Sequence, residues 1–391
     1  MNANLSTSRV RPLLVYGTRP EAIKMAPLIR ACREDAARID PIVCVTGQHR
    51  EMLDQVNAYF GVVPDLDLAV MRAGQSLSEL TGRLLTALDE VLERVKPDCL
   101  VAQGDTTSVF AAALAGFYRR VPLVHVEAGL RTGDLAAHWP EEMNRRFTSL
   151  VAAVHCAPTA RAASALAAEG VPTTQIHMTG NTVVDALLWT LDRERQHAAT
   201  WEAKYQMLGR RPLVLITGHR RENFGEGFEQ ICAAIAAAAA RSADAVFIYP
   251  VHLNPQVREP VGRLLGHLAN VHLTAPADYP EFVWLMDRAR LILTDSGGVQ
   301  EEAPSLGKPV LIMRTATERP EAVECGAAEL VGTDREKIVR RVAEILASPP
   351  PAAAAPARNP FGDGHAAERI RDLIATRRWT DASTLGADGT R

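Results

Sequence analysis

The chain has 391 residues, enough for two or three domains, and its 47% hydrophobic and 23% charged residues are ordinary for a folded globular protein. The 43 basic and 46 acidic residues give a net charge of −3, and aromatic residues make up only 5%. This composition argues against a nucleic-acid-binding protein and against a protein drawn to anionic membranes. The six cysteines include no CxxC pair, so we expect neither a zinc ribbon nor a thioredoxin-type site.

The N-terminal segment 1–9 is polar and has no apolar stretch, so we expect no signal peptide. The longest bland apolar stretch, 231–240, is too short to span a bilayer. Together these features favour a cytoplasmic enzyme that does not associate with membranes.

Short β-branched runs alternate with helical patterns in the first half of the chain. The runs at 13–16, 42–45, 99–102 and 122–126 predict buried strands, and the leucines within 76–94 recur at helical spacing. This alternation predicts a parallel sheet covered by helices on both faces.

The same alternation begins again after about residue 180. Helices are predicted at 227–241 and 255–267. The second set of predicted strands comprises 213–217, 246–251, 271–274, 291–294, 309–313 and 329–331. The fold class is therefore α/β, with two Rossmann-like, doubly wound parallel-sheet domains.

We place the first domain at 9–180 and the second at 181–363. The Pro- and Ala-rich stretch 348–360 is typical of an extended linker. A last helix is expected at 366–377, packed back on the first domain. We expect flexible tails over the remaining terminal residues, 1–8 and 380–391.

In an open parallel sheet, ligands bind beyond the carboxyl ends of the strands, so the residues after each strand are the first candidates for chemistry. The first strand is followed by Gly-Thr-Arg-Pro-Glu, in which Arg19, with Lys24 one helical turn later, is a candidate phosphate ligand. A capped helix with a solvated cation is the alternative. The sequence contains neither GxGxxG nor GxxxxGK[ST], so it gives no support for a dinucleotide site or a P-loop.

Carboxylates stand at three further points where a predicted strand ends or a helix begins. Asp105 and Glu127 each follow a predicted strand, and Glu141 and Glu142 follow Trp-Pro. Carboxylates that converge on one site perturb one another's pKa and can serve as an acid and a base. The structural alternatives are a helix cap for Asp105 and an ion pair with an arginine for Glu141 or Glu142.

Two segments of the second half point to a diphosphate. His219 follows a strand and a glycine and stands beside two arginines. Ser296, Gly297 and Gly298 join a strand to a helix, where free N–H groups and the helix dipole favour an anion, and Glu302 lies one turn further on. A plain capped turn is the alternative interpretation of this segment.

The motifs, taken in order, resemble those of the non-hydrolysing UDP-N-acetylglucosamine 2-epimerases. The matching segments include GTRPEAIKMAPL, TGQHREMLDQ, GDTTS, HVEAGLRTGD, WPEEMNRR, TGHRREN and DSGGVQEEAPSLGKPV. The resemblance implies a B-type glycosyltransferase or glycogen phosphorylase-like fold with an interdomain cleft. It also implies interconversion of UDP-N-acetylglucosamine and UDP-N-acetylmannosamine without cofactor or metal, by a cytoplasmic homodimer that supplies cell-envelope polysaccharide synthesis.

The resemblance further implies roles for individual residues. The catalytic positions correspond to Asp105, Glu127, Glu141 and His219. The UDP-binding positions correspond to Arg19, Lys24, Phe282, Ser296, Gly297, Gly298, Glu302 and Arg319.

Some family members have a second, allosteric UDP-N-acetylglucosamine site. The corresponding positions are Gln48, His49, Arg72, Glu142, Arg220 and His252. Glu51 departs from the glutamine of the activated enzymes and places a carboxylate near a diphosphate, which argues against this regulation.

Three other functions compete with this hypothesis. A hydrolysing epimerase shares the glycal chemistry and releases free N-acetylmannosamine and UDP. A B-type glycosyltransferase needs an acceptor surface, for which the sequence shows no signal. A sugar-nucleotide sensor that catalyses no reaction does not explain the set of acid/base carboxylates.

Overall fold

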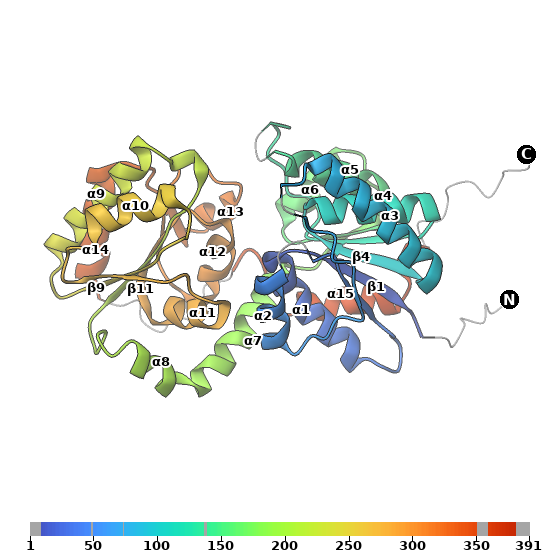
Figure 1. The fold of residues 1–391 in the computed structure, drawn as a ribbon, viewed down its shortest axis with the longest axis horizontal. Helices are drawn as coiled ribbons and strands as arrows, with labels where there is room; N and C mark the ends of the chain where they lie inside the picture. The colour runs from blue at the N-terminus through green and yellow to red at the C-terminus, as the bar shows by residue number, and fades with distance from the viewer. Residues whose placement is uncertain (1–8, 48–49, 73, 137–138, 350–358, 381–391) are drawn as a thin grey trace, which may run out of the picture. The chain divides into compact units, whose positions relative to one another are not determined.

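The computed structural model describes residues 9–47, 50–72, 74–136, 139–349 and 359–380 (Figure 1). The chain divides into two compact units. The first unit comprises 1–186 and 362–391, and the second comprises 187–361. The first division falls inside helix α7 (Thr182–Gln196), a few residues after the boundary expected at 180.

The first unit contains a seven-stranded parallel sheet in the order β3-β2-β1-β4-β5-β6-β7. Its strands are β1 (Pro12–Tyr16), β2 (Ile42–Val45), β3 (Leu66–Asp67), β4 (Cys99–Gln103), β5 (Leu123–Val126), β6 (Val154–Ala157) and β7 (Ile176–Met178). The central register pairs Leu14 with Val43 and Val101, all fully buried, as expected for parallel strands covered on both faces. The four predicted strands are confirmed, and β3, β6 and β7 were not predicted.

Helices cover this sheet. They are α1 (Arg19–Glu34), α2 (Arg50–Phe60), α3 (Leu77–Val95), α4 (Thr107–Arg119), α5 (Glu141–Val151), α6 (Ala160–Ala168) and α15 (Ala366–Ala375), with short 3-10 turns at Thr173–Gln175 and Arg378–Thr380. Helix α3 confirms the predicted helix: Ser76 and Glu79 form a capping box, and Leu84 and Leu88 are fully buried.

Helix α15 belongs to the first unit, although more than 170 residues of the second unit separate it from the rest. It packs on α1, and Arg38 donates to Asp372 at 3.0 Å. Asp185 stabilises the N-terminus of α15, because its carboxylate accepts from the backbone N–H of Ala367 at 2.8 Å. The helix ends at Ala375, two residues before the predicted end.

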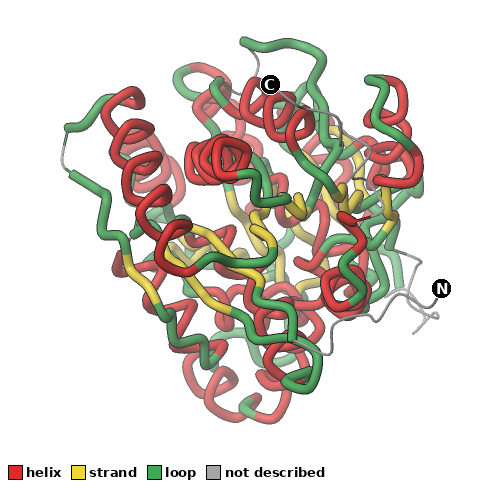
Figure 2. Tube along the Cα trace, turned by 90° about the vertical axis from the view of Figure 1, so that its right-hand side faces the viewer, coloured by secondary structure: helices red, strands yellow, loops and turns green. Residues whose placement is uncertain are grey.

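The second unit contains a six-stranded parallel sheet in the order β10-β9-β8-β11-β12-β13. Its strands are β8 (Leu213–Thr217), β9 (Val246–Pro250), β10 (Val271–Thr274), β11 (Ala289–Thr294), β12 (Val310–Ile312) and β13 (Ala328–Leu330). All six were predicted. Figure 2 shows the strands in yellow and the helices that connect them in red.

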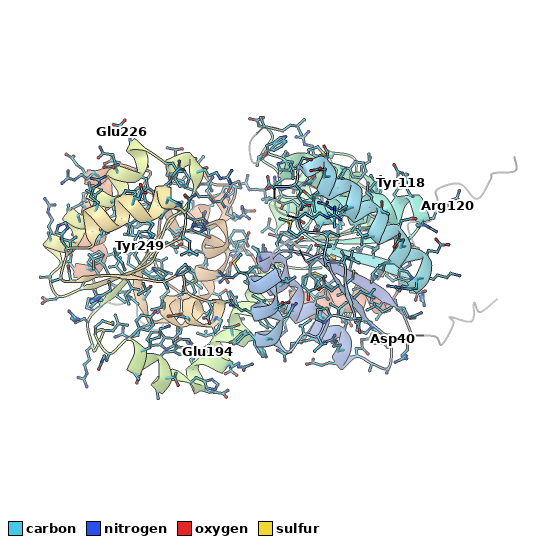
Figure 3. The ribbon with its side chains drawn as sticks, viewed as in Figure 1. Asp40, Tyr118, Arg120, Glu194, Glu226 and Tyr249 are labelled. Atoms are coloured by element: carbon cyan, nitrogen blue, oxygen red, sulfur yellow. The ribbon has the colours of Figure 1, made fainter. Side chains whose placement is uncertain are left out.

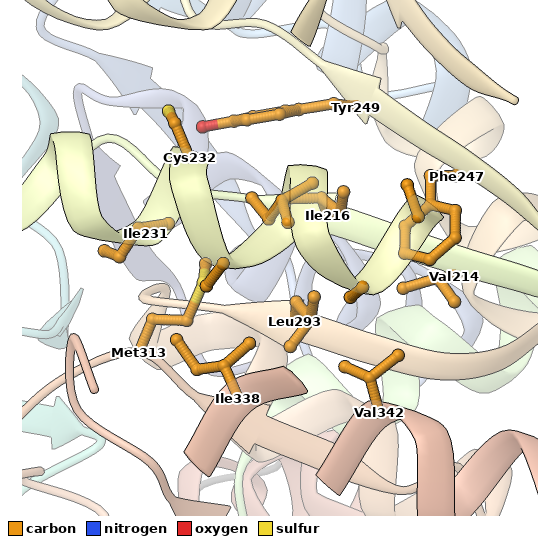
Figure 4. Packing of buried hydrophobic residues seen from close by; sticks show 14 of the residues in the cluster. Val214, Ile216, Ile231, Cys232, Phe247, Tyr249, Leu293, Met313, Ile338 and Val342 are labelled. Atoms are coloured by element: carbon orange, nitrogen blue, oxygen red, sulfur yellow. The ribbon is translucent and has the colours of Figure 1, made fainter. Parts of the chain in front are cut away.

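The helices of the second unit follow the strands in turn. They are most of α7, then α8 (Ala198–Lys204), α9 (Glu226–Arg241), α10 (Pro255–Leu265), α11 (Tyr279–Arg288), α12 (Gly297–Glu302), α13 (Pro320–Glu324) and α14 (Arg335–Ala347), with 3-10 turns at Arg221–Asn223 and Ala303–Leu306. One buried core lies between the sheet and the pair α9 and α14, and includes Val214, Leu293 and Ile338 (Figure 4).

The two parallel sheets confirm the predicted α/β fold class. Among the described helices, none has the length and apolar character needed to cross a bilayer. The expected tails fall mostly outside the described residues, except that Thr380 closes the last 3-10 turn. Most of the expected linker, 350–358, also lies outside them.

Candidate functional site

Glu127 is the most constrained carboxylate at the carboxyl edge of the first sheet. It directly follows β5 and has a φ of +62°, a left-handed conformation that is uncommon for a residue other than glycine and often marks a functional site. Lys24 of α1 donates to its two oxygens at 2.7 and 2.8 Å. Asn181 donates to it at 3.2 Å, and Gln103 donates to it as well. A strained backbone thus presents a largely buried carboxylate to three donors.

Asp105 emerges from the neighbouring strand. The last residue of β4, Gln103, pairs in register with the last residue of β5, so Asp105 and Glu127 leave the same edge of the sheet. Arg145 donates to Oδ2 of Asp105 at 2.8 Å. The helix cap of α4 is Thr106, so the alternative that made Asp105 a plain cap is wrong.

Helix α5 supplies the other acidic pair. Glu141 is its first residue and is partly exposed. Glu142 is fully buried and accepts from Thr132 N–H at 3.0 Å, from Arg145 at 2.8 Å and from Arg146 at 3.1 Å. Burial alone raises its pKa, but these donors outweigh burial and lower the pKa of Glu142. Glu142 therefore forms the structural ion pair considered as an alternative, and it presents no exposed oxygen to a second ligand.

A further buried carboxylate, Glu21, ties two of these loops together. Its side chain accepts from the N–H groups of Gly17 and Thr18 at 3.0 and 2.7 Å and from the hydroxyl of Thr106 at 2.6 Å. Burial raises its pKa. The capping box within GTRPE was a signal for Glu21, but its link to Thr106 depends on the adjacency of β1 and β4.

The second sheet presents a histidine pair at its carboxyl edge. His219 follows β8, and its ring stacks on His252, which follows β9, with centroids 5.3 Å apart and an interplanar angle of 11°. Asp295, which follows β11, accepts from the backbone N–H groups of His219 and Arg220 at 2.8 Å each. Burial lowers the pKa of His219; His252 and Arg220 lower it further, while Asp295 opposes the shift.

The Ser-Gly-Gly segment forms the start of α12, as the sequence predicted. Ser296 is the N-cap residue, and its own N–H donates to the hydroxyl of Thr294 at 2.9 Å. A Cβ on Gly297 would lie 3.1 Å from the guanidinium of Arg319, so this glycine lets the arginine approach the helix start. Arg319 is anchored by Glu301 at 2.8 Å.

Glu302 is nearly buried at the end of α12 and accepts from the hydroxyl of Tyr279 at 2.9 Å. Phe282 lies on α11, three residues after Tyr279, and is partly exposed. The second unit thus brings together Ser296, Gly297, Gly298, Glu302 and Arg319, with Phe282 on the helix of the Glu302 partner.

The expected second nucleotide-sugar site is only partly represented. Gln48 and His49 lie outside the described residues, as does the side chain of Glu51. Arg72 is exposed in the segment before α3. Arg220 and His252, by contrast, lie against His219.

Sequence reasoning did not anticipate that Gln103, Asn181 and Asp295 hold the candidate catalytic groups. It named Arg145 as a partner for Glu141 or Glu142, but not for Asp105. Each makes its contact across loops that are distant in sequence, so only the strand order reveals it. Within the described part of the chain, no three His, Cys, Asp or Glu side chains are placed to hold a metal ion.

The chain has two parallel α/β sheets, with the candidate site residues at their carboxyl edges, and its structural neighbours define the B-type glycosyltransferase-like fold class. The UDP-N-acetylglucosamine 2-epimerase family model matches residues 30–375, and the chain belongs to this family.

Sequence relatives agree over nearly the whole chain. The UDP-N-acetylglucosamine 2-epimerase of Escherichia coli K12 is 52% identical over 374 residues, which are 94% of this chain and 99% of the relative. The enzyme of the same name from Yersinia pestis is 53% identical over 376 residues, 95% of this chain and 100% of the relative.

Solved structures give the same result. The Neisseria meningitidis UDP-GlcNAc 2-epimerase bound to UDP-GlcNAc superposes with a TM-score of 0.86 at 44% identity, covering 94% of this chain and 100% of that one. The Methanocaldococcus jannaschii enzyme in complex with UDP-GlcNAc and UDP has a TM-score of 0.80 at 33% identity, with the same coverage.

Proposed function

We propose that this chain interconverts UDP-N-acetylglucosamine and UDP-N-acetylmannosamine without hydrolysis. The main observation behind the proposal is the pair of carboxylates that follow adjacent strands: Asp105 is held by Arg145, and Glu127 is held by Lys24. The relatives support the choice of substrate, since the Neisseria structure, 44% identical, contains UDP-GlcNAc.

The chemistry explains why such a pair is needed. The proton on C2 of the sugar is not next to a carbonyl group, so direct removal is very slow. Cleavage of the C1–O bond sends its electron pair to UDP and gives the ring oxocarbenium character, which makes the C2 proton acidic. A carboxylate then takes that proton and leaves 2-acetamidoglucal and UDP. Return of a proton to the opposite face of C2, with addition of UDP to C1, completes the inversion.

The first unit supplies the proton-transfer groups in this scheme. Asp105, Glu127 and Glu141 form the set from which one carboxylate accepts the C2 proton and another returns one. Lys24 and Arg145 offset the negative charge of the first two. The sequence suggested Lys24 as a phosphate ligand. In this proposal Lys24 instead binds and orients the carboxylate of Glu127.

The second unit supplies the contacts for UDP. The N–H groups at the start of α12 and the guanidinium of Arg319 stabilise the diphosphate. Glu302 accepts from the ribose hydroxyls, and Phe282 meets the uracil. His219 interacts with the departing diphosphate, and Arg19 adds a cation from the first unit.

Product analysis tests the reaction. Incubation with UDP-N-acetylglucosamine, followed by proton NMR, is expected to show UDP-N-acetylmannosamine accumulating to a constant ratio. Free N-acetylmannosamine with stoichiometric UDP would instead establish the hydrolysing reaction.

Asp105→Asn is expected to lower turnover by about two orders of magnitude or more with little loss of UDP affinity, as for removal of a general acid or base. Near-normal turnover would remove Asp105 from the proton-transfer set.

We also propose that the protein is a homodimer. Phe117 and Tyr118 near the end of α4, and Leu150 near the end of α5, are 59%, 69% and 82% exposed, and Figure 3 shows Tyr118 on the surface of the first unit. Helices α4 and α5 pack together, and exposed apolar side chains near the ends of both are suited to contact with a second copy. Light scattering after size-exclusion chromatography is expected to give twice the chain mass, and Tyr118→Glu is expected to reduce it. A monomeric wild-type protein would contradict the proposal.

A cytoplasmic location and a role in supplying cell-envelope polysaccharide synthesis complete the proposal. The six cysteines are free thiols and five are buried, which suits a reducing compartment.

A further inference from the structure

The buried carboxylate of Asp295 uses its two oxygens in different ways. Asp295 is 0% exposed at the end of β11. Its Oδ2 accepts from the N–H groups of His219 and Arg220, which fixes the turn after β8. Within the described residues, Oδ1 has no hydrogen-bond partner, and it lies 3.7 Å from Nδ1 of the His219 ring. A buried carboxylate oxygen without a partner is uncommon, so its position beside the imidazole calls for a reason.

The turn that carries His219 is held from several sides. The hydroxyl of Tyr249 donates to the carbonyl of Gly218 at 2.8 Å, and Figure 4 shows Tyr249 at the edge of the buried core. A Cβ on Gly218 would lie 3.1 Å from that hydroxyl and 3.7 Å from Oδ2 of Asp295. The ring of His252 stacks on the ring of His219. The backbone of His219 is therefore fixed, and its ring needs a shift of about 0.5–1 Å to bring Nδ1 within hydrogen-bond distance of Asp295.

The charges that act on the His219 ring come from three groups. Asp295 is the acidic group, and Arg220 and His252 are the basic ones. A carboxylate accepts hydrogen bonds and does not donate them, so it favours a proton on Nδ1. The neutral ring then has a bare Nε2, which repels a diphosphate oxygen. Only a second proton, on Nε2, makes the ring a donor to the diphosphate.

We propose that Asp295 is a positioning residue that keeps a proton on Nδ1 of His219, so that His219 binds the diphosphate only as the doubly protonated imidazolium. This inference rests on the proposed function, in which His219 interacts with the departing UDP. Binding of UDP then takes up one proton from solvent onto Nε2. The Nε2–H group donates to the diphosphate oxygen as the C1–O bond breaks and negative charge develops on UDP.

Asp295→Asn reverses the preference of the ring with little change in shape. The carboxamide oxygen must stay at the Oδ2 position, because two backbone N–H groups donate to it. The amide nitrogen then occupies the Oδ1 position and donates toward Nδ1 of His219. This favours the neutral Nε2–H form and opposes the imidazolium.

Calorimetric titration of the full-length protein with UDP, in buffers of different ionisation enthalpy at about pH 7.5, measures the proton uptake. The wild type is expected to take up close to one proton, and Asp295→Asn close to none. The variant's kcat is expected to fall by about two to four orders of magnitude, because the imidazole then carries its proton on the wrong nitrogen, as when the aspartate of a catalytic His–Asp pair is replaced. The change in KM is expected to be smaller. Asp334→Asn is the matched control, because Asp334 also accepts from a backbone N–H in this unit, at the start of α14. This substitution is expected to change neither the proton uptake nor kcat. Wild-type proton uptake in Asp295→Asn would overturn the proposal.

Nitrogen-15 NMR of the histidine rings tests the proposal without an activity measurement and without the Asp295 variant. The His219 signals, assigned by their loss in His219→Gln, are expected to show the Nδ1–H tautomer in the wild-type protein above its pKa. The Nε2–H tautomer there would overturn the inference even if the protein proves an active epimerase. Absence of epimerase activity with the Nδ1–H tautomer present would count against the proposed function and not against the role of Asp295.

Discussion

The ion pair between Lys24 and Glu127 allows a quantitative test of the first unit. The side chains are only 12% and 8% exposed, and the ammonium lies 2.7 Å from one carboxylate oxygen. At an effective dielectric constant of about 20, the attraction is about 6 kcal/mol. The cost of removing two charges from water offsets much of this attraction, but loss of one partner leaves the other charge buried and costs about 3 kcal/mol.

Lys24→Met and Glu127→Gln are each expected to destabilise the first unit by about 3 kcal/mol. Gln103 and Asn181 still donate to the carboxylate in Lys24→Met, but both are neutral. The double variant is expected to lose about 2 kcal/mol less than the sum of the two single losses, because it buries no unpaired charge.

Hydrogen exchange of the β1, β4 and β5 amides, followed by mass spectrometry in increasing urea, reports on the first unit separately. Arg119→Met provides a control, since it breaks an exposed ion pair with Asp89 and is expected to leave exchange nearly unchanged. Strictly additive losses in the double variant would show that the two charges do not stabilise each other, and the reasoning would be wrong.

Three other predictions follow from burial. Burial lowers the pKa of His125 to about 4 and that of His155 to about 3, so folding favours the neutral form of both rings. The resulting contribution to the free energy of unfolding is about 3 kcal/mol for His125. It is present above about pH 6.5 and is lost as the pH falls through 4. Acid unfolding curves are expected to show this loss, and His155→Leu should flatten it; an unchanged slope would contradict the assignment. Glu302→Ala is expected to weaken UDP binding at least about tenfold in calorimetry, since it removes the buried carboxylate proposed to accept from ribose, and unchanged affinity would remove Glu302 from the site. Leu293→Ala, in the core of Figure 4, is expected to destabilise the second unit by about 2–5 kcal/mol in urea unfolding, and a loss below about 1 kcal/mol would contradict the packing.

The strands with the longest apolar runs were predicted from the sequence. Strand β1 reads Pro-Leu-Leu-Val-Tyr and β8 reads Leu-Val-Leu-Ile-Thr, and both were found. Strands β6 and β7 were missed because their apolar runs are short: β6 reads Val-His-Cys-Ala and β7 reads Ile-His-Met. In β6, a neutral, buried histidine replaces the expected apolar residue.

The candidate catalytic positions were predictable because parallel strands end at one edge of a sheet. Asp105 and Glu127 were identified from their places after strands, and the register of β4 and β5 brings them to the same edge. The partner of Glu127 was not predictable, since Lys24 is 103 residues away and reaches it only through the order β1-β4-β5. Asp295 was missed for the same reason: its role depends on the turn after the neighbouring strand β8.

Isotope exchange at C2 tests the central claim most directly. The protein is incubated with UDP-N-acetylglucosamine in D₂O, and the recovered nucleotide sugars are analysed by NMR and mass spectrometry. Non-hydrolytic epimerisation through elimination predicts one deuterium at C2 of UDP-N-acetylmannosamine, and its gradual appearance at C2 of the recovered substrate. Formation of UDP-N-acetylmannosamine that retains the original C2 hydrogen would contradict the account.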